Sequence, residues 1–174
     1  TKIIEVSDDF FGEASRMLND KEAVFIEDKY DEHGKWMDGW ESKRRRDGGN
    51  DWAIIELGSP GIITKIDIDT SFFTGNFPPF ASIEGLYSDQ KPSKDSDWIE
   101  ILSKTSLKGD SGNKFKIESK TKVNYIKLQI FPDGGVARLR LFGEVKLNWD
   151  NYHNKNDLIE LSSLKLGGSI VSYN

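Results

Sequence analysis

The sequence predicts an all-β protein, an antiparallel β-sandwich of the jelly-roll type with only short helices. Short runs of bulky apolar residues recur along the chain, and segments rich in glycine, proline and aspartate separate them. Within several runs apolar and polar residues alternate; over 63–69, Ile66 and Ile68 fall between Lys65, Asp67 and Asp69. Such alternation is typical of a strand with one buried face.

Eight segments are expected to form strands. They are residues 2–6, 51–57, 63–69, 81–87, 98–102, 114–117, 123–131 and 136–142. Gly58-Ser59-Pro60-Gly61 predicts a tight turn between the second and third of them. Further turns are expected at 90–93, 109–112 and 132–135. A short helix is predicted over 9–18.

The end of the chain has a different pattern. A helix is predicted over 156–166, with Asn156 as its N-cap and Gly167 just after its last turn. The polar stretch 148–155 before it indicates a linker. We therefore expect a sandwich module over residues 1–147, a linker over 148–155, and over 156–174 the opening helix and strand of a second, truncated module.

Composition excludes several classes of protein. The chain has 174 residues, a formal net charge of −5 and 36% hydrophobic residues, so it can bury a core, whereas a nucleic-acid or anionic-membrane binder would carry a basic excess. It contains no cysteine and only two histidines, which stand apart in polar stretches, so we expect no metal site and no cofactor. No apolar run approaches the length of a membrane span, and no apolar signal region opens the chain, so a cytoplasmic protein is expected.

Three segments combine glycine, acidic, aromatic and arginine residues at high density. They are residues 35–46, 69–79 and 132–140. If successive strands reverse direction, counting strands from Asp51 places all three segments at the same end of the sandwich. Because loops on a rigid scaffold often carry binding and catalytic residues, we expect a functional site at that end.

Each segment also has a purely structural interpretation. Trp36 and Trp40 are expected to pack against the core or a lid rather than to contact a ligand. The basic run 43–46 fits a solvated surface as well as an anion-binding site. Asp133-Gly134 fits a simple turn.

Three long stretches of the sequence resemble the signature segments of the allantoicase family, in the family's order. They are KWMDGWESKRRR, DWAIIELGSPGIITKIDIDTSFFTGNFPPFASIEG and PDGGVARLRLFGEV. The resemblance runs from about Ile3 to Val145, and it extends more loosely to the discoidin-like, galactose-binding jelly rolls, which implies the same fold. Family members hold two homologous modules in tandem, and residues 156–174 resemble the start of the second. One departure is Asn50, where many members have histidine before Asp51-Trp52.

The resemblance implies a hydrolase of purine degradation that converts allantoate, the substrate, to ureidoglycolate and urea. Acid and base roles are expected among four carboxylates, Asp38, Glu41, Asp69 and Glu84. Expected substrate-binding residues are Arg44 and Arg138 for the substrate carboxylate, Thr70 and Asn76 for the ureido groups, and Asp133.

Two alternatives remain open at this point. A noncatalytic β-sandwich could bind a small ligand or a carbohydrate through the same end. The module could also serve mainly in assembly, as the structural half of an enzyme. Its expected partners are allantoate and either further copies of itself or the second module, with no nucleic acid and no membrane.

Overall fold

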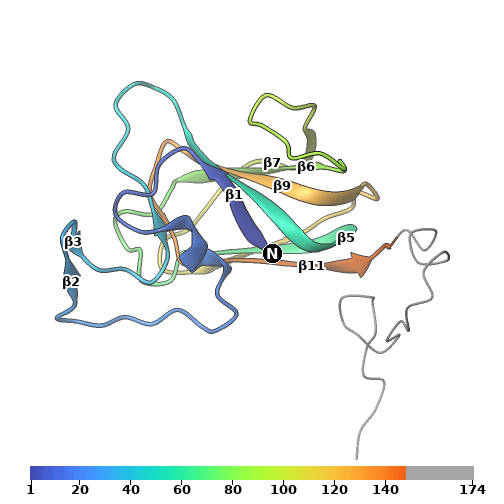
Figure 1. Cartoon of the computed structure of the whole chain (residues 1–174). Coiled ribbons are helices and arrows are strands. Elements are labelled where there is room, and N and C mark those ends of the chain that lie inside the picture. The colour runs from blue at the N-terminus through green and yellow to red at the C-terminus, as the bar shows by residue number, and fades with distance from the viewer. Residues whose placement is uncertain (148–174) are drawn as a thin grey trace, which may run out of the picture.

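The computed structural model describes residues 1–147, and the expectations for 148–174 lie outside the described residues. Residues 1–147 form eleven strands and one short 3₁₀ helix (Figure 1). In chain order they are β1 (Lys2–Val6), η1 (Ala14–Leu18), β2 (Tyr30–Asp31), β3 (Gly34–Lys35), β4 (Trp40–Glu41), β5 (Asp51–Asp69), β6 (Phe80–Leu86), β7 (Ile99–Ser106), β8 (Gly112–Lys116), β9 (Lys122–Phe131), β10 (Gly135–Val136) and β11 (Arg138–Val145).

Seven of the strands form two layers that share β5, whereas β4 pairs with β10 and β2 with β3 in separate two-stranded ladders. The first part of β5 pairs with β1 and β9, and the sheet continues through β6 to β7. The last part of β5 lies between β11 and β8. All of these pairings are antiparallel, which confirms the predicted all-β antiparallel sandwich.

Strand β5 folds back on itself at the predicted turn. Its register against β9 shifts between Glu56 and Gly61. The first and last residues of β5 both contact the short segment 132–137. The Asp51 N–H donates to the Pro132 carbonyl (3.0 Å), and the Ala137 N–H donates to the Asp69 carbonyl (2.8 Å). Pro132 and Ala137 can lie at most about 18 Å apart, because five residue steps separate them. A straight 19-residue strand is much longer than that, so β5 must bend for its two ends to contact this segment. The predicted reversal is therefore confirmed, whereas the predicted break in the strand is wrong, because 57–61 remain extended.

The core lies between the two layers. It is built from alternate residues, as the sequence pattern predicted: Ile66 and Ile68 from β5 face Ile126, Leu128 and other side chains of the opposite layer, and all four are fully buried. Burial of this apolar surface is the main stabilising term of the fold.

The predicted helix over 9–18 is mostly wrong. Only Ala14–Leu18 is helical, as a 3₁₀ helix. The N–H groups of Phe11 and Gly12 both donate to the Glu41 carbonyl (3.1 Å each), and Glu41 N–H donates back to Gly12. Since these backbone groups are used by β4, they cannot close a helical turn. No helix within residues 1–147 has the length and apolarity to cross a membrane.

Candidate functional site

The three chemically dense segments meet at one end of the sandwich, here called the loop end, which carries residues 36–50, 70–79 and 132–137 (left in Figure 1). Gly135 of β10 pairs with Glu41 of β4, and Gly135 N–H also donates to the Asn76 carbonyl (2.7 Å). Ser42 N–H donates to the Gly134 carbonyl (3.3 Å). The predicted convergence is thus confirmed.

Two glycines allow this close approach. Gly134 has φ +130°, a conformation that L side chains rarely adopt, and a β-carbon there would lie 2.6 Å from the Asn76 carbonyl oxygen. At Gly135 a β-carbon would lie 2.0 Å from the ring of Phe73. The Asp-Gly-Gly sequence therefore does more than make a turn, because it packs the 70–79 loop against the 132–137 loop.

Arg138 is buried and fully occupied. Its side chain is 1% exposed, and its guanidinium donates to the carbonyls of Lys21 (2.8 Å) and Asp38 (2.9 Å) and to the Asp38 carboxylate (2.6 Å). Further donations reach the carbonyls of Arg16, Glu22 and Ala137. With its donors used in this way, Arg138 fastens the 16–24 and 36–39 segments to β11 and offers no group to a substrate.

Asp38 helps Arg138 to hold the 16–24 and 36–39 segments in place. Burial alone would raise its pKa, but hydrogen bonds from Arg138 and the Val24 N–H, together with the Arg138 and Arg16 charges, bring the pKa below the ordinary value. A carboxylate held ionised by a buried guanidinium is a poor proton donor near neutral pH.

Asp69 and Thr70 anchor loops. Asp69 accepts hydrogen bonds from the Ser71 hydroxyl (2.6 Å) and from Arg140 (3.2 Å). The Thr70 hydroxyl is buried and donates to the carbonyl of Lys108 (2.6 Å) or of Ser111 (3.0 Å). The structure places both predicted site residues in the wall of the loop end rather than on its surface.

Glu84 lies on a different face. It points outward from β6, where Lys127 binds it at 2.7 Å and Gln129 donates to it at 3.1 Å. Asn50 donates to the same Gln129 side chain at 3.3 Å. The structure therefore does not bring Glu84 together with the other predicted catalytic carboxylates.

Glu41 and Asn76 form a pair at the loop end. Asn76 Nδ2 donates to Glu41 Oε1 at 2.7 Å. Burial raises the pKa of Glu41, the Asn76 hydrogen bond opposes that rise, and the charge of Asp31 adds to it, so that the net pKa is above the ordinary value. Glu41 is half-buried, so it combines a raised pKa with access from solvent, as a general acid requires.

Asp51 is the functional candidate that sequence reasoning missed. It opens β5, is 1% exposed, and accepts hydrogen bonds at Oδ1 from Ser7 (2.8 Å) and Arg45 (2.7 Å). Its Oδ2 is buried without a hydrogen-bond partner among the described residues. A charged residue at the start of an otherwise apolar run, directly after a basic stretch, was the available signal, because an aspartate is seldom fully buried unless it is paired.

Asp51 forms the floor of a pocket of about 540 Å³ between the end of β1 and the loop 43–47. Asp133 shapes the pocket by accepting the Arg45 N–H at 2.7 Å. Arg45 also pairs with Asp47, and this hydrogen bond holds the pKa of Asp47 below its ordinary value. We call this cavity the loop pocket.

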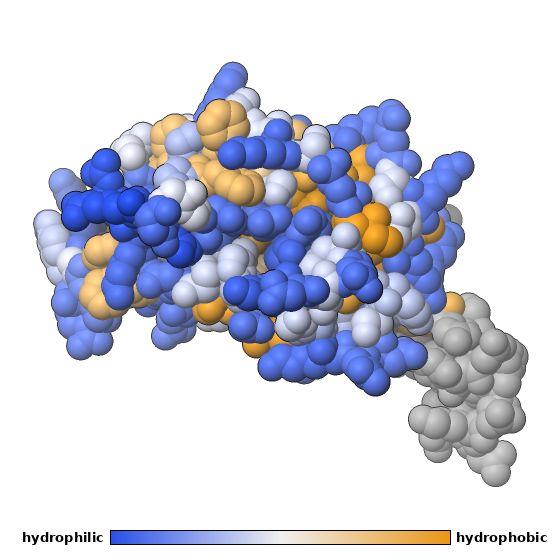
Figure 2. Space-filling view, turned by 90° about the horizontal axis from the view of Figure 1, so that it is seen from above, coloured by the Kyte–Doolittle hydropathy of each residue, from blue (hydrophilic) through white to orange (hydrophobic). Residues whose placement is uncertain are grey.

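Two arginines in the loop pocket have no partner among the described residues. Arg44 and Arg46 both line it, and within residues 1–147 no hydrogen bond or ion pair engages either guanidinium. Seen from above, the most hydrophilic side chains gather at the end of the molecule that carries this loop (Figure 2). The loop pocket thus offers two free guanidinium groups above a buried carboxylate, a combination suited to a small ligand with a carboxylate and N–H donors.

Comparison with known proteins identifies relatives of this chain. The family model described as Allantoicase repeat matches residues 1–146. A probable allantoicase 1 from Burkholderia mallei is 45% identical over 172 residues, which is 98% of this chain and 51% of that protein. A probable allantoicase from Acinetobacter baumannii (strain SDF) is 45% identical over 99% of this chain and 50% of its own length.

Solved structures agree. A structure described as that of allantoicase is 31% identical, with a TM-score of 0.79, over 95% of this chain and 49% of that chain. The C-terminal domain of a chitobiase from Bacteroides fragilis, 16% identical with a TM-score of 0.60 over 84% of this chain and 95% of its own, shares the fold alone. The chain spans about half the length of the curated relatives it matches.

Proposed function

This chain belongs to the allantoicase family, and from that premise we propose that it supplies one half of a hydrolase that converts allantoate to ureidoglycolate and urea. We place the reaction in the loop pocket. The observation that carries this assignment is one pocket lined by Asp51, whose buried Oδ2 has no partner within residues 1–147, and by two arginines that are unpaired within the same residues.

The substrate fits this set of groups. Allantoate carries one carboxylate and two ureido groups on a central carbon. Arg44, with Arg46 beside it, would bind the carboxylate through paired N–H donors. Asp51 Oδ2 would accept a hydrogen bond from a ureido N–H or from the attacking water, which supplies the partner that this oxygen lacks.

The reaction breaks the bond between the central carbon and one ureido nitrogen, and forms a bond from that carbon to a water oxygen. Water gives up one proton, and the departing nitrogen receives one. We assign the base to Asp51. Glu41 lies at the loop end but outside the lining of the loop pocket, and we assign the acid to it because its raised pKa favours the protonated form needed for donation. Asn76 would keep Glu41 oriented.

The remaining predicted residues take other places in this proposal. Asp133 acts by positioning Arg45 and with it the loop 43–47. Arg138, Asp38, Asp69 and Thr70 hold the loops that frame the site. We further propose that residues 156–174 begin a second module, that 148–155 connect the two, and that the module acts in association with that second half or with further copies.

The proposal is tested by urea release in the full-length enzyme. Asp51→Asn is expected to lower kcat by about 100-fold or more with little change in KM, as removal of a general base does. Arg44→Gln is expected to raise KM for allantoate about 10-fold or more, because a charge-assisted hydrogen bond is lost.

Two variants serve as controls. Asp95→Asn repeats the aspartate change and Lys104→Gln removes a different cation, both outside the pocket, in the 87–98 loop and on β7, and both should keep full activity. If Asp51→Asn folds with an unaltered melting temperature and releases urea at the normal rate, the loop pocket is not the reaction site.

A further inference from the structure

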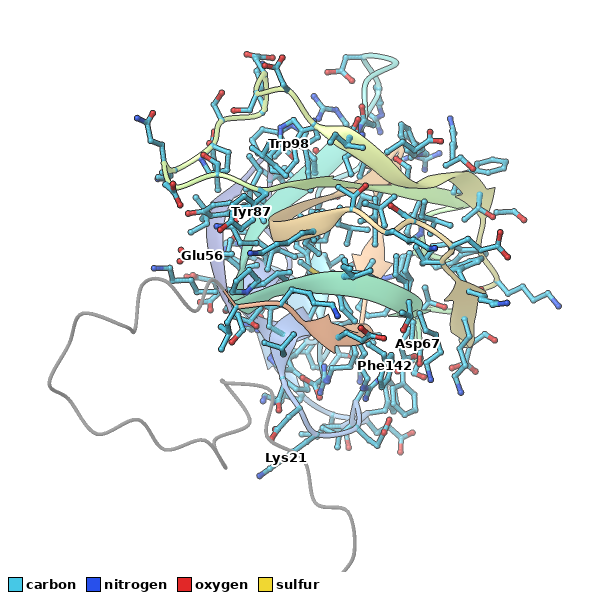
Figure 3. The ribbon with its side chains drawn as sticks, turned by 90° about the vertical axis from the view of Figure 1, so that its right-hand side faces the viewer. Lys21, Glu56, Asp67, Tyr87, Trp98 and Phe142 are labelled. Carbon is cyan, nitrogen blue, oxygen red and sulfur yellow. The ribbon has the colours of Figure 1, made fainter. Side chains whose placement is uncertain are left out.

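A second polar hollow lies on the outer face of the layer formed by β11, β5 and β8. Across these strands Arg140, Asp67 and Lys114 stand opposite one another in register. Phe142 and Lys65 form the next row on the same face. Asp67 and Phe142 project on this side of the molecule (Figure 3).

Asp67 sits between two cations and is hydrogen-bonded to neither. Arg140 is engaged elsewhere, with Asp69 at 3.2 Å and Glu22 at 3.1 Å. Lys114 makes no hydrogen bond or ion pair within the described part of the chain. Asp67 itself is 7% exposed, and its Oδ1 is buried with no hydrogen-bond partner in the part of the chain that the structure describes. A buried carboxylate oxygen without a donor is costly, and in native proteins such groups usually have a partner.

Space for that partner exists. Asp67 and Lys114 line a hollow of about 390 Å³, within the size range of sites for small ligands. Gly112 contributes to the opening, because a β-carbon at that position would lie 3.4 Å from Asp67 Oδ1. Burial, with the nearby charge of Asp69, raises the pKa of Asp67 above its ordinary value, so the carboxylate lacks the stabilisation that an N–H donor would provide.

The charges around the hollow decide what kind of ligand fits. Three acidic side chains (Glu22, Asp67 and Asp69) face three basic ones (Lys65, Lys114 and Arg140). A cationic ligand that paired with Asp67 would lie beside the Lys114 ammonium, and an anionic ligand that paired with Lys114 would lie beside the Asp67 carboxylate, so in each case a repulsion offsets part of the attraction. A neutral group with N–H donors on one side and a carbonyl on the other meets neither.

We propose that the hollow between Asp67 and Lys114 is a binding site for a small neutral ureide or carbamoyl compound, which donates N–H to Asp67 and accepts from the Lys114 ammonium. The site is separate from the loop pocket, since none of its lining residues lines that pocket. Its existence does not depend on the proposed reaction, although urea belongs to the class of ligand it would take.

Titration of the isotopically labelled 174-residue chain with N-methylurea, followed by amide NMR, tests this inference. We expect saturable shifts at residues 65–69 and 112–114, and no saturable shift there with acetate or guanidinium at equal concentration. Absence of saturation with N-methylurea overturns the proposal, as does tighter binding of either charged probe.

Variants assign the contacts. Asp67→Asn removes the carboxylate, and Lys114→Met removes the ammonium but keeps the stem; each should weaken N-methylurea binding about 10-fold, as expected for one lost hydrogen bond to a charged group. Lys116→Met, two residues along β8 and outside the hollow, is the matched control and should bind normally. Equal affinity in all three variants contradicts the proposal, and Lys114→Met decides the matter if Asp67→Asn does not fold.

Discussion

At the scale of single residues, Arg138 shows how a charged side chain can belong to the frame of a site instead of its chemistry. Its guanidinium contacts segments 100 or more residues away in sequence, including the Asp38 carboxylate 100 positions earlier and the Lys21 carbonyl 117 positions earlier. A guanidinium fork suits this task because its five donors leave in fixed directions.

Replacing Arg138 should therefore be severe. Arg138→Met removes the charged donor to Asp38, leaving that carboxylate only the Val24 N–H, and removes the side-chain donor to several carbonyls. We expect it to lower the free energy of unfolding by about 3–5 kcal/mol. Lys2→Met, which removes an exposed ion pair with Glu56, should change it by less than about 1 kcal/mol. Guanidinium chloride unfolding at pH 7 measures both, and equal midpoints for the two variants would refute the buried role.

Replacing Asp67, unlike replacing Arg138, is expected to raise the free energy of unfolding at neutral pH. Its pKa is raised in the folded chain, with burial as the leading cause, so between the unfolded value of 3.8 and the folded value the folded state binds more protons. The free energy of unfolding then falls as pH rises through this window. Asp67→Asn cannot ionise, so it should be more stable than the wild type at neutral pH.

Unfolding curves of the two proteins between pH 3 and pH 7 provide the test, without any ureide present. The expected result is a difference in stability that grows with pH and then levels off. A difference that stays constant, or a variant that is less stable at pH 7, would mean that the Asp67 carboxylate is stabilised in a way that its contacts do not explain.

The sequence could predict which segments carry site residues but not which side chains remain free. Three predicted site residues reach the loop end with accessible groups, namely Glu41, Asn76 and Arg44. Asp38 and Arg138 were nominated for the same reason and turn out to bind each other. The difference arises from long-range pairing across about 100 residues, which no local pattern encodes.

At the scale of elements, the fold-back of β5 determines where the site forms. Because the strand reverses near Gly61, Asp51 and Asp69 both reach the loop end. Alternation and turn residues were enough to predict this reversal and the strands around it. They were not enough for residues 9–18, because the backbone of this segment pairs with β4 and most of it does not form the expected helix.

The ladder beside this bend should tolerate little extra volume. A β-carbon at Gly143 of β11 would lie 2.0 Å from the Ile62 carbonyl oxygen, at the register shift between β11 and β5. We expect Gly143→Ala to cost about 1–3 kcal/mol of stability through this overlap. At Gly75, where nothing lies within 4 Å, the same substitution should cost less than about 0.5 kcal/mol.

Thermal or denaturant unfolding of the two glycine variants makes the comparison within one chain. Since neither glycine has a positive φ, the difference between them reports steric contact rather than backbone strain. If both variants are as stable as the parent chain, the close approach of β11 to β5 at Gly143 is incorrect.

At the scale of the whole molecule, the chain matches about half of the length of each of these relatives. The loop pocket opens at the loop end, whereas β11 ends at the opposite end of the sandwich, where β5 turns back (Figure 1). Val145 therefore lies far along the sandwich from the loop pocket.

The position of an unreactive analogue of allantoate bound to the full-length enzyme decides whether the loop pocket is the reaction site. We expect a crystal structure of that complex to place the analogue carboxylate within hydrogen-bonding distance of Arg44, with a ureido N–H directed at Asp51 Oδ2. An analogue bound at full occupancy elsewhere, touching neither residue, would contradict the proposed site.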